Sequence, residues 1–174
     1  RSHEKDSLKM AVVYLGIGSN VGDCQANIDK AVALLKEHED IQFVTLSTVI
    51  ETEPVGGPPQ NPYLNAAIKI NTDLMPLDLL TQLKMIERRL GRTKSDLVNM
   101  PRPMDLDILF YDDVVIVEGK NLFIPHPRLA ERLFVLKPLF EIAPDVVHPR
   151  LHKTVRELLE ALSCHADPSE PQGA

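Results

Sequence analysis

The stretch that decides the fold is Pro101-Arg102-Pro103-Met104-Asp105-Leu106-Asp107-Ile108-Leu109-Phe110-Tyr111, whose second half has the apolar, β-prone composition of a strand. Residues two apart on a strand point to the same side, so we expect Asp105 and Asp107 on one face. Leu106, Ile108 and Phe110 are expected on the other face. Two adjacent carboxylates repel each other unless a cation or a basic group lies between them. The pattern therefore predicts a cation site or, as is commoner for an isolated Asp-x-Asp, a solvated outer face of a half-buried strand.

Basic residues lie close to these carboxylates, at Arg88, Arg89, Arg92, Lys94 and Arg102. Mg²⁺ is usually bound by one or two carboxylates together with substrate phosphates, and Arg102 is placed to reach a phosphate. On a chain of net charge −6, a local basic segment suits a small polyanion better than a nucleic acid. The alternative is a solvated helix end and loop.

Hydrophobic periodicity predicts the elements on either side of this stretch. We expect strands at 11–17, 41–53, 64–71 and 104–111, and helices at 24–37 and 76–90. The resulting order is strand, helix, strand, strand, helix, strand, which is that of a ferredoxin-like βαββαβ sandwich. The fold class is therefore predicted as α+β, an antiparallel sheet with helices on one face.

A C-terminal extension follows the sandwich. We expect an outer hairpin from 114–117 and 122–124, a helix at 128–136 and a last helix at 154–162, where Thr154 and Glu157 have the spacing of a capping box. Residues 1–10 are predicted to be a disordered terminus or a remnant of expression, 11–163 one domain, and 164–174 a disordered tail.

Composition places the chain among ordinary globular proteins. Its 174 residues are enough for one domain with a core, and 44% hydrophobic with 25% charged residues is typical of that class. No apolar run is long enough to span a membrane, and the first ten residues lack the apolar centre of a signal peptide. Two cysteines make no disulfide framework. We therefore expect a reduced, cytoplasmic protein, monomeric by default, without membrane or nucleic-acid partners.

Two glycines interrupt the first strand, at Gly16 and Gly18. The next glycine, Gly22, misses the spacing of a dinucleotide-binding fingerprint. We interpret Gly16 and Gly18 as steric: they keep the strand thin where something packs closely against it.

Tyr63 and Asn65 are two apart on a predicted strand and should face the same side. An aromatic ring beside an amide suits a flat heterocycle, which it can both stack on and hydrogen-bond. A core tyrosine with a turn-capping asparagine explains these two residues equally well. His126 and Arg132 are candidates for phosphate contacts, although a histidine next to a proline is more often a loop hydrogen-bonder.

Several motifs occur in the order known from one family. They are Leu15-Gly16-Ile17-Gly18-Ser19-Asn20, the segment 52–56, Tyr63-Leu64-Asn65-Ala66-Ala67, the stretch 101–110, Ile124-Pro125-His126-Pro127-Arg128 and Pro138-Leu139-Phe140-Glu141-Ile142-Ala143-Pro144. Together they resemble 6-hydroxymethyl-7,8-dihydropterin pyrophosphokinase, an enzyme of folate biosynthesis. The resemblance runs from about residue 11 to 162 and makes 11–163 a pyrophosphokinase domain. It implies transfer of pyrophosphate from ATP, the co-substrate, to the pterin hydroxymethyl group, with release of AMP.

The resemblance also implies roles for individual residues. Asp105 and Asp107 would hold two Mg²⁺ ions, Arg92 and Arg102 would clamp the phosphates as catalytic residues, and 92–103 would close as a lid. ATP would contact Lys84, Glu87, Lys94, Arg102, Ile108, His126 and Arg132. The pterin would contact Thr52, Pro54, Val55, Gly56, Tyr63, Asn65 and Phe134, between the rings of Tyr63 and Phe134.

The chain departs from the family pattern at a few positions. Lys84 stands where a glutamine is familiar, and Lys94 where an arginine can occur. Met100 replaces the usual glycine before Pro101, which stiffens the backbone there. Asn121 and Phe123 occupy nucleotide-side positions without an assigned role.

Two alternatives to an enzyme stay open. One is a non-catalytic ferredoxin-like module that binds a ligand, since fold does not dictate function. The other is an interaction domain whose acidic strand face is merely solvated. The retained aspartates and arginines argue against the first, and Mg²⁺-dependent nucleotide binding would exclude the second.

Overall fold

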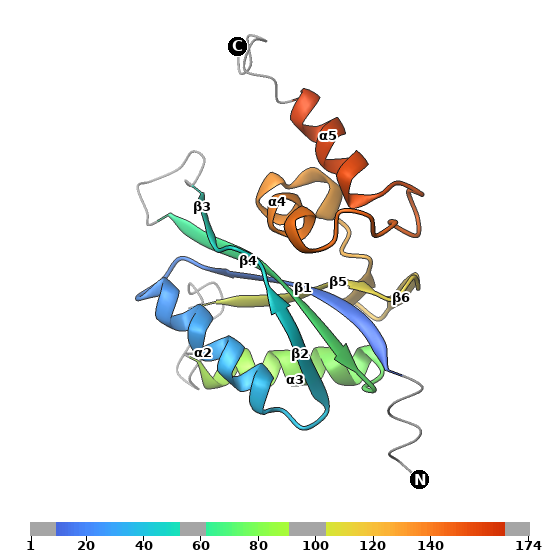
Figure 1. Ribbon diagram of the computed structural model, residues 1–174. Helices are drawn as coiled ribbons and strands as arrows, with labels where there is room; N and C mark the ends of the chain where they lie inside the picture. Colours follow the sequence, from blue (N-terminus) through green and yellow to red (C-terminus); the bar gives the residue numbers. More distant parts are fainter. Residues whose placement is uncertain (1–9, 53–61, 91–103, 166–174) are drawn as a thin grey trace.

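The computed structural model describes residues 10–52, 62–90 and 104–165, and these form a five-stranded antiparallel sheet between two layers of helices (Figure 1). The strands run in the order β2-β4-β1-β5, and β3 also pairs with β4. The strands are β1 (Ala11–Ser19), β2 (Ile41–Leu46), β3 (Ile50–Thr52), β4 (Tyr63–Thr72) and β5 (Asp105–Tyr111). The predicted α+β class is confirmed, and so is the predicted order of elements apart from the additional strand β3.

One face of the sheet is covered by α2 (Cys24–Glu37) and α3 (Pro76–Arg89), below the sheet in Figure 1. Their apolar stripes pack on the inward residues of the central strands, and the shared core is fully buried at Leu15, Ile68 and Leu106. The side chain of Asp23 caps α2, because its Oδ1 accepts a hydrogen bond from the amide of Ala26 at 3.1 Å.

The opposite face carries the C-terminal extension, which supplies a second helical layer. It consists of the short 3₁₀ turn η1 (Leu129–Glu131), α4 (Leu133–Ile142) and α5 (Val155–His165). Thr154 and Glu157 form the predicted capping box: Glu157 N donates to Thr154 Oγ1 at 3.1 Å, and Thr154 N donates to Glu157 Oε1 at 2.8 Å.

The helix predicted at 128–136 was wrong in both extent and continuity. Arg132 is extended, with φ −123° and ψ 109°, and separates η1 from α4. Helix α4 then runs from Leu133 to Ile142, and Pro138 lies inside it. A proline lacks the N–H that an inner helical position needs, so local pattern alone does not predict this continuation.

The single strand predicted at 41–53 is two strands on one edge of β4. The break falls at Ser47, which is buried and bonds to Ala67 twice: Ser47 N donates to Ala67 O, and Ala67 N donates to Ser47 Oγ, both at 2.9 Å. A bulge between Phe43 and Thr45 precedes the break. Apolar alternation continues through such a kink, which is why the pattern reads as one strand.

A second bulge corrects the predicted faces of β5. The register against β1 passes from Ile108 opposite Leu15 to Phe110 opposite Tyr14, so Leu109 is an extra residue. Phe110 consequently lies on the same face as Asp105 and Asp107, packed in the core under α4 and α5, rather than with Leu106 and Ile108.

The predicted outer hairpin is confirmed as β6 (Ile116–Glu118) and β7 (Leu122–Ile124). Leu122 and Ile124 are buried in the main core, which holds the hairpin against the end of α3. Among the described residues, no helix is long and apolar enough to cross a membrane.

Candidate active site

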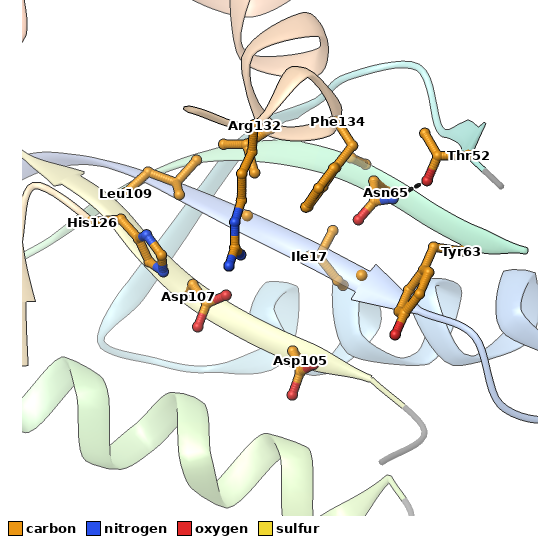
Figure 2. A pocket seen from close by; sticks show the side chains of 14 residues that line it. Ile17, Thr52, Tyr63, Asn65, Asp105, Asp107, Leu109, His126, Arg132 and Phe134 are labelled. Carbon is orange, nitrogen blue, oxygen red and sulfur yellow. Dashed lines mark hydrogen bonds between the residues drawn. The ribbon is translucent and has the colours of Figure 1, made fainter. Parts of the chain in front are cut away.

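A pocket of about 480 Å³ opens on the second face of the sheet, beside the part that α4 covers (Figure 2). Strands β1, β4 and β5 form its floor, and the beginning of α4 forms a side wall. The side chains that project into it include an aromatic pair, an amide, two carboxylates, an imidazole and a guanidinium. The lining residues are Gly16, Ile17, Gly18, Thr52, Tyr63, Asn65, Ala66, Asp105, Asp107, Leu109, His126, Arg132, Phe134 and Val135.

The floor is open because two of the three β1 residues that line it are glycines. Gly16 lies opposite Asp107, and Gly18 lies between Asn65 on β4 and Asp105 on β5. A Cβ at Gly18 would come within 2.9 Å of Asn65 Oδ1, closer than real Cβ contacts allow. At Gly16 the nearest atom would be the flexible Leu109 Cδ2, at 3.4 Å. The glycines therefore leave room for the amide and for Leu109, as their expected steric role requires.

One end of the pocket is built for a flat polar ring. Asn65 is only 8% exposed, and its Nδ2 donates to Thr52 Oγ1 at 3.1 Å, which fixes the amide plane. The rings of Tyr63, 40% exposed, and Phe134, 36% exposed, flank it from β4 and α4. Large exposed aromatic rings beside a fixed, buried amide offer stacking and hydrogen bonding to the same ligand.

The two carboxylates lie at the other end, side by side on β5 (Figure 2). Asp105 is exposed and Asp107 half-buried. Within the described ranges, no three acidic, histidine or cysteine side chains gather as a potential metal site. Mg²⁺ bound at Asp105 and Asp107 would complete its shell with substrate oxygens and water, which are its usual further ligands.

A second pocket, of about 450 Å³, lies beyond β5, between α3 and the β6–β7 hairpin. Two cationic side chains of α3, Lys84 and Arg88, line it. Asp107 and His126 belong to both pockets, so the two cavities meet at these side chains. Its lining is Leu77, Leu80, Thr81, Lys84, Arg88, Asp107, Ile108, Asn121, Leu122, Phe123, His126 and Pro127.

His126 is held in place at this junction by one hydrogen bond to β5 and one within its own loop. Its backbone N donates to Leu109 O at 3.1 Å, and its Nδ1 accepts from Arg128 N at 3.2 Å. Burial lowers the pKa of His126, and Arg132 and Arg128 lower it further, while Asp107 raises it. The imidazole is therefore neutral near pH 7, with Nδ1 occupied as an acceptor and the proton assigned to Nε2.

Glu87 lies behind the strand and is absent from the linings of both pockets. It is 1% exposed, and its Oε2 accepts from Leu106 N at 2.7 Å, between the two aspartates. Burial raises its pKa, an effect that the Leu106 N–H and Lys84, at 3.5 Å, oppose. Glu87 thus fixes the β5 backbone at the position where the carboxylates are carried.

The structure gathers most of the predicted site residues. The first pocket contains Thr52, Tyr63, Asn65, Asp105, Asp107, His126, Arg132 and Phe134; the second contains Lys84, Asp107, Ile108 and His126. Arg132, expected on the nucleotide side, lies in the first pocket with its guanidinium 5.6 Å from the centre of the Phe134 ring. Outside the described residues lie Pro54, Val55, Gly56, Arg92, Lys94 and Arg102, together with the predicted lid and most of the two predicted disordered ends. The predicted tail at 164–174 begins too early, because α5 continues to His165.

Several lining residues were not given a ligand contact of their own from the sequence, among them Thr81, Arg88, Leu109 and Val135. Thr81 and Arg88 lie one helical turn on either side of Lys84, so helical spacing could have identified them. Leu109 follows Asp105 and Asp107 by simple strand alternation, so the period of two alone could have placed it on the pocket face. Val135 lines the pocket because α4 begins at Leu133, a start that the sequence pattern did not predict.

Comparison with known proteins gives one consistent result. The family model for 7,8-dihydro-6-hydroxymethylpterin-pyrophosphokinase matches residues 14–144. The 2-amino-4-hydroxy-6-hydroxymethyldihydropteridine pyrophosphokinase of Bacillus subtilis is 44% identical over 135 residues, which are 78% of this chain and 80% of that protein. The Aquifex aeolicus protein of the same name is 44% identical over 148 residues, 85% of this chain and 90% of its own length.

Longer proteins match as well. The folic acid synthesis protein fol1 of Schizosaccharomyces pombe is 41% identical over 160 residues, 92% of this chain, but the match spans only 22% of that protein. A crystal structure of wild-type Plasmodium falciparum HPPK-DHPS superposes with a TM-score of 0.75, covering 92% of this chain and 46% of the other at 16% identity. That likeness establishes the shared fold.

Proposed function

Because this chain belongs to the 7,8-dihydro-6-hydroxymethylpterin-pyrophosphokinase family, we propose that it transfers a pyrophosphoryl group from ATP to the hydroxymethyl group of 6-hydroxymethyl-7,8-dihydropterin and releases AMP. The observation that carries the proposal is the junction of two pockets at Asp107 and His126. One pocket suits a flat heterocycle and the other a polyanion. A transfer between two substrates needs such a shared boundary, where the reacting atoms meet.

The pterin belongs in the first pocket. Tyr63 and Phe134 would stack on its two faces, and the amide of Asn65, fixed by Thr52, would pair with its polar edge. This orientation directs the hydroxymethyl group toward Asp105 and Asp107, at the opposite end of the cavity.

ATP belongs in the second pocket, with its phosphates reaching over β5. Lys84 and Arg88 supply positive charge there, and Phe123 offers an apolar surface at its edge. Arg132 supplies a further cation on the pterin side. The neutral imidazole of His126 can donate its Nε2–H to a phosphate oxygen at the junction. Arg92, Lys94 and Arg102 are predicted to add phosphate contacts.

Asp105 and Asp107 fit a magnesium site, because both carboxylates line the open pocket and Mg²⁺ commonly binds one or two protein carboxylates together with phosphates. Bound there, the ion would neutralise phosphate charge that develops during transfer. We propose two such ions. The contribution of the chain itself is to hold both carboxylates at fixed positions, through the β1 pairing and the Glu87–Leu106 hydrogen bond.

The test is to mix the protein with ATP, Mg²⁺ and 6-hydroxymethyl-7,8-dihydropterin and to identify the adenine nucleotide released. We expect AMP in amounts equal to the pyrophosphorylated pterin, and none when the pterin is omitted. ADP would instead indicate single phosphoryl transfer. Pterin binding without nucleotide release would favour the ligand-binding module.

The wider context stays a prediction. We expect a monomer in the cytoplasm with no nucleic-acid partner. The chain spans only 22% of the length of the Schizosaccharomyces pombe fol1 protein. Size-exclusion chromatography with light scattering tests the oligomeric state.

A further inference from the structure

The break between β2 and β3 is held from two sides. On the sheet side, buried Ser47 makes its two hydrogen bonds to Ala67. On the helix side, the next residue, Thr48, faces Glu141 of α4. The chain is therefore tied to β4 and to α4 at successive residues.

The contact between Thr48 and Glu141 is extensive for a pair on the surface. Thr48 N donates to both carboxylate oxygens, to Oε1 at 3.0 Å and to Oε2 at 3.2 Å, and Thr48 Oγ1 donates to Oε2 at 3.1 Å. Hydrogen bonds to an ionised acceptor are stronger than neutral ones. Both residues are exposed and neither lines either pocket, so the contact is not part of the ligand lining.

The contact joins α4, which carries Phe134, to the β2–β3 connection, which leads to Thr52. Thr48 is four residues before Thr52, whose Oγ1 holds the amide of Asn65. Glu141 is two helical turns after Phe134 on the same rigid helix. In Figure 1, α4 lies over the sheet next to β3, and the two elements are in contact.

We propose that the Glu141–Thr48 pair is a positioning element that sets the spacing between the Phe134 wall and the Asn65–Tyr63 wall, and so tunes pterin binding. A stacked ring needs a gap of defined width, and a displacement of about 1 Å near a bound substrate can reduce a rate a hundredfold. The inference rests on the proposed function, because it assigns the gap to the pterin.

The defining experiment is Glu141→Ala with steady-state kinetics for each substrate. Removal of the carboxylate frees the β2–β3 connection from α4, while alanine favours the helix. We expect the KM for the pterin to rise about tenfold, the equivalent of one charge-assisted hydrogen bond, and the KM for ATP to stay within about twofold. Glu141→Gln, which keeps an acceptor for Thr48 N, should recover most of the pterin affinity.

Two further variants separate positioning from general stability. Asp145→Ala is the matched control: it removes an exposed carboxylate just beyond α4 that pairs with Arg156 at 3.1 Å. It should leave both KM values unchanged. Thr48→Val deletes one of the hydrogen bonds and should raise the pterin KM by an intermediate factor.

The outcomes distinguish this proposal from the function on which it rests. A wild-type protein that releases no AMP contradicts the proposed function. If the wild type is active, the positioning role is overturned by a Glu141→Ala variant with an unchanged pterin KM. It is equally overturned if the pterin and ATP KM values rise together with a lowered melting temperature, because that is the result of a merely structural contact.

Discussion

The two halves of β5 lie on one sheet and serve opposite purposes. Before the bulge at Leu109, the strand presents Asp105 and Asp107 to an open pocket. After the bulge, it presents Phe110 to a core that α4 and α5 cover. The same face of one sheet thus lines an open pocket at one end and a core at the other, and the difference lies in what covers it.

The two halves also differ in their packing and in the charge that they carry. The covered half is apolar and well packed: Phe110 is 1% exposed, with its ring edge-on to Tyr14 and His148 at 6.4 and 5.7 Å between centroids. The open half has glycines in its floor and two neighbouring carboxylates, which repel each other. We therefore expect changes in the open half to reduce activity and changes in the covered half to reduce stability.

The largest effect should come from Asp107→Asn in the open half. The substitution keeps the size of the side chain but removes a charge that both pockets share, so we expect AMP formation to fall roughly a thousandfold. The midpoint of urea unfolding should stay the same or rise, since one of two like charges is gone. Asp112→Asn, at the far end of the same strand, is the charge-matched control, with wild-type turnover. An active Asp107→Asn enzyme would contradict the assignment of the open half.

In the covered half, Phe110→Ala should give the converse result. The loss of a fully buried ring destabilises a core by about 3 kcal/mol or more. We expect this loss in the free energy of unfolding, with both KM values of the folded fraction close to wild type. Phe110→Leu, which retains more volume, should unfold at an intermediate urea concentration. If Phe110→Leu instead lost pterin affinity at unchanged stability, the two halves would not be separable.

A smaller effect is expected at Gly18, in the floor of the open half. A methyl group there would lie 2.9 Å from Asn65 Oδ1 and displace the amide, so Gly18→Ala should raise the pterin KM about tenfold and spare ATP binding. Gly16→Ala meets only the movable end of Leu109, at 3.4 Å, and should be milder. Steady-state kinetics with each substrate would measure the KM values of both variants. A reversed ranking of the two glycines would contradict the steric account.

Sequence periodicity predicted the open half better than the covered half. Asp105 and Asp107 precede the bulge, where simple alternation holds, and Tyr63 with Asn65 follow the same rule on β4. Alternation fails at Phe110, because the extra residue at Leu109 reverses every later side chain. Alternation fails again at Ser47. There, hydrogen bonds to Ala67, which lies on β4, terminate β2.

The unpredicted parts share a physical cause: they depend on partners far away in the chain. The position of Glu87 on α3 suits a nucleotide contact. Its carboxylate instead accepts a hydrogen bond from the backbone N–H of Leu106, nineteen residues later. Glu141 bonds to Thr48, ninety-three residues earlier. No local pattern in the sequence predicts such pairs. The motifs that occur in family order predicted most of the pocket residues, because they identify the family and with it the residues that meet in the fold.

The smallest expected effect concerns pH and the covered half, at His148. This side chain is 6% exposed, and its Nδ1 accepts from Arg150 N at 3.2 Å and Leu151 N at 3.1 Å. Burial, with help from Arg150 and His152, lowers its pKa from the ordinary value of 6.5. The unfolded chain therefore binds this proton more readily, and the stability that the neutral ring contributes is present above pH 6.5 and is lost as the pH falls through its lowered pKa.

His148→Asn keeps an acceptor oxygen for the two amides but cannot titrate in this range. In urea unfolding at a series of pH values from 7.5 downward, the wild type should lose stability more steeply than the variant, by at most one proton in slope. The variant should be less stable at every pH, because its packing against Phe110 is lost. The pterin KM of the variant should match that of the wild type, since His148 belongs to the covered half. If the two proteins lost stability with the same pH slope, the acid sensitivity would belong to another group. His126, in the open half, would then be the first residue to substitute.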